Sequence, residues 1–145
     1  MKNKLEDLIN TLKILRDENG CEWNKEQTHK TLVPYLLEET YEVIEAIVNE
    51  DYDLLKEELG DLLLHVIFQA ELADEKKIFN IYDSIFNINQ KLINRKPHIF
   101  LNPNNDKLKK SNWEVAKKSE KNRQSVLDGV PIALPSLTKA RRIQE

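Results

Sequence analysis

Residues 52–74 read YDLLKEELGDLLLHVIFQAELAD. The first half of this stretch is amphipathic with helical spacing, whereas residues 62–68 are apolar almost all round a helix. A helix that is apolar on every side is surrounded by protein. We therefore expect a central helix from Tyr52 to about Asp74, with Asp51 as its N-terminal cap, whose second half is covered from all directions.

A second helix is predicted directly before the central one, in residues 33–48, which read VPYLLEETYEVIEAIV. Thr31 can cap its start, and the apolar pattern continues to about Asn49. Two helices with so short a connection form an antiparallel hairpin. The apolar stripe of this second helix consists of Val33, Leu37, Tyr41, Ile44 and Val48.

The rest of the chain is also predicted to be helical. The residue pattern predicts helices at about 4–16, 81–94 and 106–122, and a short helical segment in the tail 127–145. Residues 17–30 have no apolar period and are expected to form an ordered loop. Only three Gly and five Pro occur among the 145 residues, of which 32% are charged, so the composition also fits an all-α fold.

Chain length indicates a single domain. We expect this domain at residues 1–125, and at residues 126–145 a C-terminal tail or the start of a linker to a second domain. One chain offers few helices to cover the central helix. We therefore expect a second copy to supply the remaining cover, so that a four-helix core forms across a homodimer.

Charge and cysteine content exclude several classes of protein. A formal net charge of −3 gives no overall field that would attract nucleic acid or an anionic membrane. The single cysteine, Cys21, forms no internal disulfide, and no apolar run approaches the roughly 20 residues of a membrane span. We expect a cytoplasmic protein that binds neither nucleic acid nor membrane.

Four acidic residues recur in pairs three residues apart on the two hairpin helices. Glu39 and Glu42 lie on the first helix, and Glu58 and Asp61 lie on the second. At about 100° per residue, the members of each pair point in similar directions, away from the apolar stripe of the helix. In an antiparallel hairpin the two pairs can face each other and offer carboxylate oxygens to Mg²⁺.

Solvation of two exposed helix faces is the alternative explanation of these acids. On an exposed face, like charges three or four residues apart cost only ~0.2–0.5 kcal/mol per pair. Acids that meet between helices at ~5 Å cost about 3 kcal/mol per pair at an effective dielectric constant of 20. Asp61 stands where the apolar run begins, and Gly60 costs ~1 kcal/mol in a helix and suggests close approach of another group. Both residues favour the metal site.

Several further motifs accompany the acids Glu38-Glu39-x-x-Glu42 and Glu58-x-x-Asp61. They are Asn19-Gly20-Cys21-x-Trp23-x-x-x-Gln27-Thr28-His29, Pro34-Tyr35-Leu36-Leu37, Lys91-Leu92, Arg95-x-Pro97-His98-Ile99-Phe100 and Trp113-Glu114. Together they cover nearly the whole chain and resemble the MazG nucleoside triphosphate pyrophosphohydrolases, most closely the first domain of two-domain members. The resemblance implies an all-α, MazG-like helical bundle completed by homodimerisation.

The resemblance also implies an activity and a set of site residues. Nucleoside triphosphates would be hydrolysed to a nucleoside monophosphate and pyrophosphate, as part of nucleotide-pool house-cleaning. Glu39, Glu42, Glu58 and Asp61 would bind Mg²⁺, with Mn²⁺ as an alternative ion, and Glu38 would position water. The implied phosphate and nucleotide contacts are Lys91, Arg95, Trp113 and Lys117. Trp23 and Tyr35 are further candidates for substrate contact, and each fits a core role equally well.

The sequence departs from the family pattern at a few positions, and two other functions stay open. Asn94 and Lys96 alter the basic cluster around Arg95, which bears on phosphate affinity. One alternative is a non-catalytic dimeric helical interaction module with an acidic, metal-binding face. The other is a Mg²⁺-dependent phosphohydrolase that releases orthophosphate. His65, one turn after Asp61, is the histidine with a place near the acids.

Overall fold

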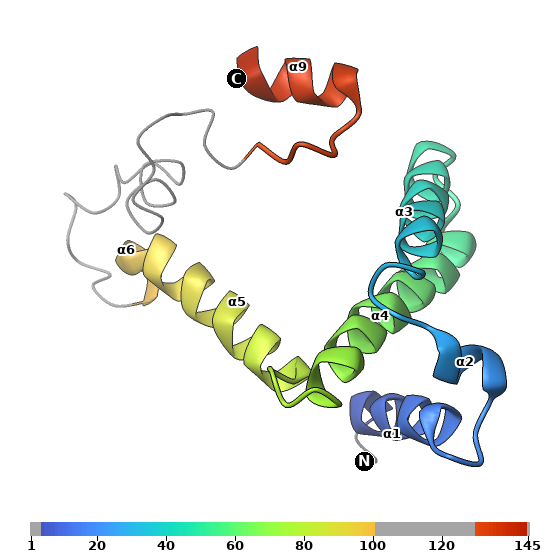
Figure 1. The fold of residues 1–145 in the computed structure, drawn as a ribbon. Helices are drawn as coiled ribbons and strands as arrows, with labels where there is room; N and C mark the ends of the chain where they lie inside the picture. Colours follow the sequence, from blue (N-terminus) through green and yellow to red (C-terminus); the bar gives the residue numbers. More distant parts are fainter. Residues whose placement is uncertain (1–3, 101–129, 145) are drawn as a thin grey trace. The chain divides into compact units, whose positions relative to one another are not determined.

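The computed structural model describes residues 4–100 and 130–144, and over these ranges it contains helices and no strand (Figure 1). The chain divides into two compact units, residues 1–86 and 87–145. None of the described helices is both long enough and apolar enough to cross a membrane. The expectation of an all-α fold is confirmed for the described part of the chain.

The helices follow the predicted order. Their bounds are α1 Lys4–Arg16, α2 Glu22–Glu26, α3 Val33–Val48, α4 Tyr52–Asp74, α5 Ile81–Arg95, α6 Pro97–Phe100 and α9 Ser136–Gln144. The prediction of a loop over residues 17–30 was wrong in part, because this segment contains α2. The helix predicted at 106–122 lies outside the described residues.

Helices α3 and α4 form the predicted hairpin and lie side by side (Figure 1). Asp51 caps α4 as expected, since its carboxylate accepts a hydrogen bond of 3.0 Å from the Leu54 amide. Thr31 does not cap α3. Its hydroxyl instead accepts a hydrogen bond from the Thr28 amide within the preceding turn, and Leu32 occupies the cap position.

The turn between α3 and α4 ends α3 with a left-handed residue. Glu50 has a φ of 55°, and the amides of Glu50 and Asp51 donate to the carbonyls of Ile47 and Ala46. This hydrogen-bond pattern is a Schellman motif, in which glycine is the usual left-handed residue. The chain therefore reverses direction within three residues, which places the first half of α4 against α3.

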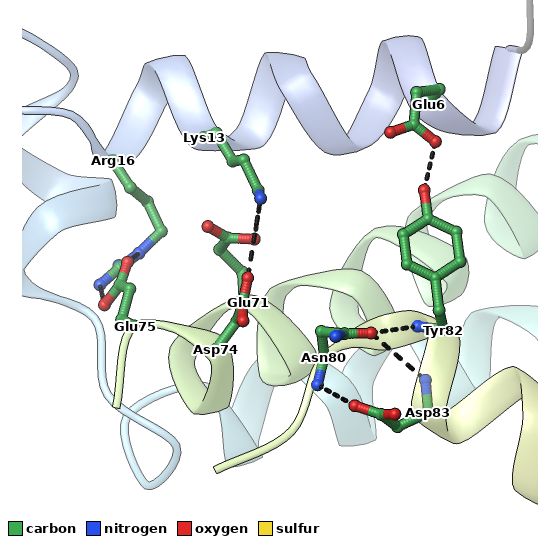
Figure 2. Close-up of polar contacts among 9 residues, drawn as sticks. All are labelled: Glu6, Lys13, Arg16, Glu71, Asp74, Glu75, Asn80, Tyr82 and Asp83. Atoms are coloured by element: carbon green, nitrogen blue, oxygen red, sulfur yellow. Dashed lines mark hydrogen bonds and ion pairs between the residues drawn. The ribbon is translucent and has the colours of Figure 1, made fainter. Parts of the chain in front are cut away.

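The core of the first unit lies between α1 and the second half of α4. Its buried residues come from α1, from the approach to α3, from α4 and from the first turn of α5: Ile9, Leu12, Leu32, Ile67, Phe68, Ala70, Leu72 and Ile81. Polar contacts at the edge of this core join α1 to the end of α4 and to Tyr82, as Figure 2 shows. The core thus holds the C-terminal half of α4 in place, whereas the N-terminal half of α4 packs against α3.

The apolar stripe of α3 does not pack against α4 in the described chain. Its five residues are between 47% and 74% exposed. The side of α3 that meets α4 is formed instead by partly or fully buried residues that include Leu36, Thr40, Val43 and Ala46. On α4, Leu59, Leu63 and Val66 are also more than 40% exposed, so the described chain leaves uncovered the part of α4 for which we expect a second copy to supply the cover.

Two glycines have opposite surroundings. A Cβ atom on Gly20 would overlap with the carbonyl oxygens of Leu15 and Ile14 at the end of α1, so the chain can pass there only with glycine. A Cβ atom on Gly60 would meet no described atom within 4 Å. No described residue makes the close approach expected at Gly60, and approach of a ligand or of another backbone there stays a prediction.

We predict opposite effects of alanine at these two positions. Gly60→Ala should raise the free energy of unfolding by about 1 kcal/mol, because alanine favours the helix interior. Gly20→Ala should lower it by at least about 1 kcal/mol, because the backbone must move to admit the methyl group. Urea denaturation followed by circular dichroism measures both, and a loss of stability in Gly60→Ala would show that another group packs there.

Candidate metal and nucleotide site

Three carboxylates from α3 and α4 meet between the two helices. Glu39 of α3 and Glu58 and Asp61 of α4 each offer one oxygen atom, and these atoms all lie within 4.8 Å of one another. All three residues are partly buried. The antiparallel hairpin causes this convergence, since Glu39 is level with the first half of α4.

The other two acids of α3 take different positions. Glu42, the fourth predicted ligand, is partly buried and adjoins Glu39, but it does not belong to the group of three oxygens. Glu38 is exposed and lies outside that group. The structure therefore brings three of the four predicted ligands together, with Glu42 beside them.

Partial burial and electrostatic repulsion together raise the proton affinity of the cluster. Partial burial, a hydrogen bond shared with Glu42 and the nearby charges of Glu42, Asp61 and Glu58 raise the pKa of Glu39 to about 7. Partial burial and the charges of Glu42 and Asp61 likewise raise the pKa of Glu58. Like charges held this closely disfavour full ionisation unless a cation or protons neutralise them.

His65 is a buried neighbour of the acidic cluster. The side chain is 10% exposed, and its Nε2 lies 4.0 Å from Oε1 of Glu39. Its Nδ1 is buried and has no hydrogen-bond partner within the described part of the chain. Burial lowers the pKa of His65, against the opposing effect of Asp61, so the ring is predominantly neutral at pH 7.

This donor set fits a hard divalent cation. Mg²⁺ prefers carboxylate oxygens and binds through a few of them while retaining waters and substrate phosphates. Three oxygens within 4.8 Å of one another can reach one ion by small side-chain rotations. A cation at this point would also offset the repulsion that raises the pKa of Glu39.

An aromatic pair lies one helical turn from the acids. The rings of Trp23 in α2 and Tyr35 in α3 meet edge to face, with centroids 5.6 Å apart and an interplanar angle of 80°. Both side chains are 40% or more exposed, so neither belongs to the core that the described residues form. Tyr35 precedes Glu39 by four residues, which places both on one face of α3.

The remaining predicted site residues are not placed relative to this cluster. Lys91 is exposed and Arg95 is buried, and both belong to the part of α5 in the second unit, residues 87–145. Trp113 and Lys117 lie outside the described residues.

Sequence reasoning missed the contacts that hold the segment before α3. Arg16 binds the carbonyl oxygen of Asn24 in α2, and His29 Nδ1 lies 2.6 Å from the Gln69 side-chain oxygen of α4. The one available signal was the polar, period-free character of residues 17–30, which leaves hydrogen bonds as the main means of holding the segment.

The raised pKa of Glu39 predicts how metal-free stability depends on pH. The folded state binds this proton more tightly than the unfolded state, whose carboxyl pKa is near 4.5. Its stabilising contribution is therefore complete below that value and is lost as the pH rises through about 7. In EDTA, the melting temperature should fall as the pH rises from about 4.5 to about 7, and it should fall less in Glu39→Gln. Equal slopes in both proteins would contradict the clustering.

Comparison with known proteins agrees with this arrangement. The family model described as MazG nucleotide pyrophosphohydrolase domain matches residues 27–100, which include α3 and α4 in full. A nucleoside triphosphate pyrophosphohydrolase/pyrophosphatase MazG of Thermotoga maritima is 45% identical over 142 residues, or 97% of this chain and 55% of that protein.

A nucleoside triphosphate pyrophosphohydrolase of Escherichia coli K12 is 43% identical over 149 residues, or 99% of this chain and 57% of that protein. The chain thus spans little more than half the length of these relatives. Because the family model covers half of the chain and both helices that carry the acids, this chain belongs to the MazG nucleotide pyrophosphohydrolase family.

Proposed function

We propose that this chain hydrolyses nucleoside triphosphates to a nucleoside monophosphate and pyrophosphate in a reaction that requires Mg²⁺. The observation that carries the proposal is the convergence of the Glu39, Glu58 and Asp61 oxygens between two helices of a MazG-family chain. The names of the similar proteins from T. maritima and E. coli agree with this activity. Clearing unwanted nucleotides from the cytoplasmic pool is the role that we infer.

The chain's acids divide the work between ion binding and water positioning. Glu39, Glu58 and Asp61 would hold the ion, with Glu42 as a fourth ligand. Bound Mg²⁺, or Mn²⁺ in its place, supplies positive charge beside the triphosphate and makes a nearby water more acidic. Exposed Glu38 would orient that water and accept its proton while the water oxygen bonds to the α-phosphorus. The α–β bridging bond breaks and pyrophosphate leaves.

Other side chains would bind the rest of the nucleotide. Lys91 and Arg95 would neutralise phosphate oxygens, and Trp113 and Lys117 would complete the nucleotide contacts. Trp23 and Tyr35 offer exposed aromatic surface one turn from Glu39, which suits a nucleobase.

We predict that Asp61→Asn and Glu42→Gln each lower kcat at least about 100-fold. Loss of a direct ligand should exceed the 10–100-fold effect that follows loss of a hydrogen-bond partner of a ligand. Glu45→Gln, which removes a charge from an exposed position of α3, is the matched control and should retain activity. The assay incubates each NTP and dNTP with Mg²⁺ and separates the products by ion-exchange chromatography.

The same assay separates the competing functions. Release of pyrophosphate with a nucleoside monophosphate supports the proposal. Release of orthophosphate would identify a phosphohydrolase of another kind. No product, together with no increase in melting temperature on addition of Mg²⁺, would indicate a non-catalytic helical interaction module.

We further propose that the exposed apolar face of the hairpin is covered by a second copy of the chain. The residues on this face are Leu37, Tyr41 and Ile44 of α3 and Leu59, Leu63 and Val66 of α4. All of them are more than 40% exposed, and adjoining apolar side chains on two long helices usually mark an interface. Two hairpins that pack through such faces form a four-helix bundle.

Sedimentation velocity tests the homodimer. The unmodified chain should sediment as a dimer at micromolar concentration, and Leu63→Lys should shift it to a monomer because a charge would enter the apolar interface. Ile14→Lys is the control, because Ile14 is 69% exposed on α1, outside the hairpin face, and should leave the dimer intact. A stable monomer of the unmodified chain would contradict the proposal.

A further inference from the structure

Arg16, the last residue of α1, lies at the junction of three segments. Its side chain is 8% exposed, and its guanidinium group binds both carboxylate oxygens of Glu75, which follows α4, with an Nη2 to Oε2 distance of 2.8 Å (Figure 2). The guanidinium carbon also lies 5.2 Å from the centre of the Phe68 ring. The hydrogen bonds from Arg16 hold the pKa of Glu75 below its usual range. Arg16 is therefore fixed on two sides by α4 and the residue after it.

The third partner of Arg16 is the backbone of α2. Nη1 of Arg16 donates a hydrogen bond to the carbonyl oxygen of Asn24, the residue after Trp23. This contact joins the part of the chain that carries Trp23 to the C-terminal end of α4, through a side chain that α4 already holds in place.

Helix α2 cannot be positioned by its own packing. It has five residues, none of them buried, and no side chain caps its N-terminus. A helix this short is unstable by itself, so its position depends on contacts with the rest of the chain. Hydrogen bonds supply these contacts: Cys21 N to Leu15 O at 2.8 Å, Lys25 Nζ to Glu18 O at 3.0 Å and the bond from Arg16. Of these three, the Arg16 bond is the one that leads to the end of α4.

The position of Trp23 matters because of its neighbour. Its ring meets Tyr35 edge to face, and Tyr35 lies one turn before Glu39 on α3. A shift of α2 would separate the two rings and change the aromatic surface beside the acids. Arg16 lies outside this surface and reaches it only through Asn24.

We propose that Arg16 is a positioning residue for nucleotide binding: by bridging Glu75 and the Asn24 carbonyl, it holds Trp23 against Tyr35 beside the acidic cluster. The proposal rests on the proposed function, in which the aromatic pair contacts the nucleobase. Arginine suits the role because its planar group carries five N–H donors in a fixed geometry and can bind a carboxylate and a carbonyl together. Lysine at this position would keep the charge and lose the bridge.

The chain contains a matched control for this test. Lys13, one turn earlier on α1, also reaches α4: its Nζ lies 3.8 Å from Oε2 of Glu71 and 3.7 Å from Oδ2 of Asp74 (Figure 2). Within the described residues, Lys13 forms no hydrogen bond or ion pair with α2. Arg16→Lys and Lys13→Gln thus both weaken the link between α1 and α4. Only Arg16→Lys removes the link to the segment that carries Trp23.

The first experiment measures steady-state kinetics on the full chain with Mg²⁺, at a temperature well below the melting point of every variant. Arg16→Lys should raise KM about tenfold and leave kcat within about twofold, because the acids and the ion remain in place. The dissociation constant of α,β-methylene ATP, which cannot be cleaved at that bond, should rise by the same factor. Lys13→Gln should change neither value by more than about twofold.

A double-mutant cycle tests whether Arg16 acts through Trp23. In a Trp23→Ala background, Arg16→Lys should have no further effect on KM, because the ring that it positions is absent. In a Trp113→Phe background, where Trp23 is the one remaining tryptophan, Arg16→Lys should increase quenching of its fluorescence by acrylamide. Lys13→Gln should leave the quenching unchanged.

The outcomes separate this inference from the function on which it rests. An active enzyme whose KM is unchanged in Arg16→Lys overturns the role of Arg16 alone. So does an equal rise of KM in Lys13→Gln, or a full additional effect of Arg16→Lys in the Trp23→Ala background. A chain that neither hydrolyses nucleoside triphosphates nor binds the analogue overturns both proposals.

Discussion

Repulsion among carboxylates confined between α3 and α4 is the constraint on which the candidate site depends. Three acidic oxygens within 4.8 Å of one another destabilise the hairpin unless they are protonated or neutralised by a cation. The hairpin keeps them together because its tight turn sets the register and the core holds the far half of α4 against α1. A cation bound at the proposed site would therefore stabilise the fold, because the scaffold supplies the energy that opposes the repulsion and the ion would offset it.

The hairpin and its acids could be predicted because their signals are local. The spacing of Glu39, Glu58 and Asp61 on two consecutive helices, with Asp51 as a cap between them, indicates both the elements and their antiparallel pairing. Helical periodicity predicts which residues share one face of a helix, but it does not predict which other helix packs against that face. The apolar stripe of α3 was identified correctly as a face, yet it remains exposed and does not pack against α4 in the described chain.

Two other features lie beyond what periodicity can predict. Helix α2 leaves no apolar period because none of its residues is buried. The bridge made by Arg16 joins residues 16, 24 and 75, a set that becomes visible only once the chain is folded. Gly60 is the converse case, since its cost to the helix suggested a close neighbour, and none of the described residues is that neighbour. The roles of Lys91, Arg95, Trp113 and Lys117 remain predictions.

No side chain of α2 is buried. In this segment, therefore, the atoms that maintain the fold differ from the side chains that form its surface, whereas in most helices the same residues serve both purposes. Substitutions on a segment without buried side chains leave core packing unchanged, so their effect on folding is small. The side chain of Glu22 can therefore change freely while the hydrogen bonds to the backbone of the segment keep it in place. Under the proposed function, in which α2 adjoins the nucleobase, substitutions in α2 would change nucleotide preference without loss of the fold.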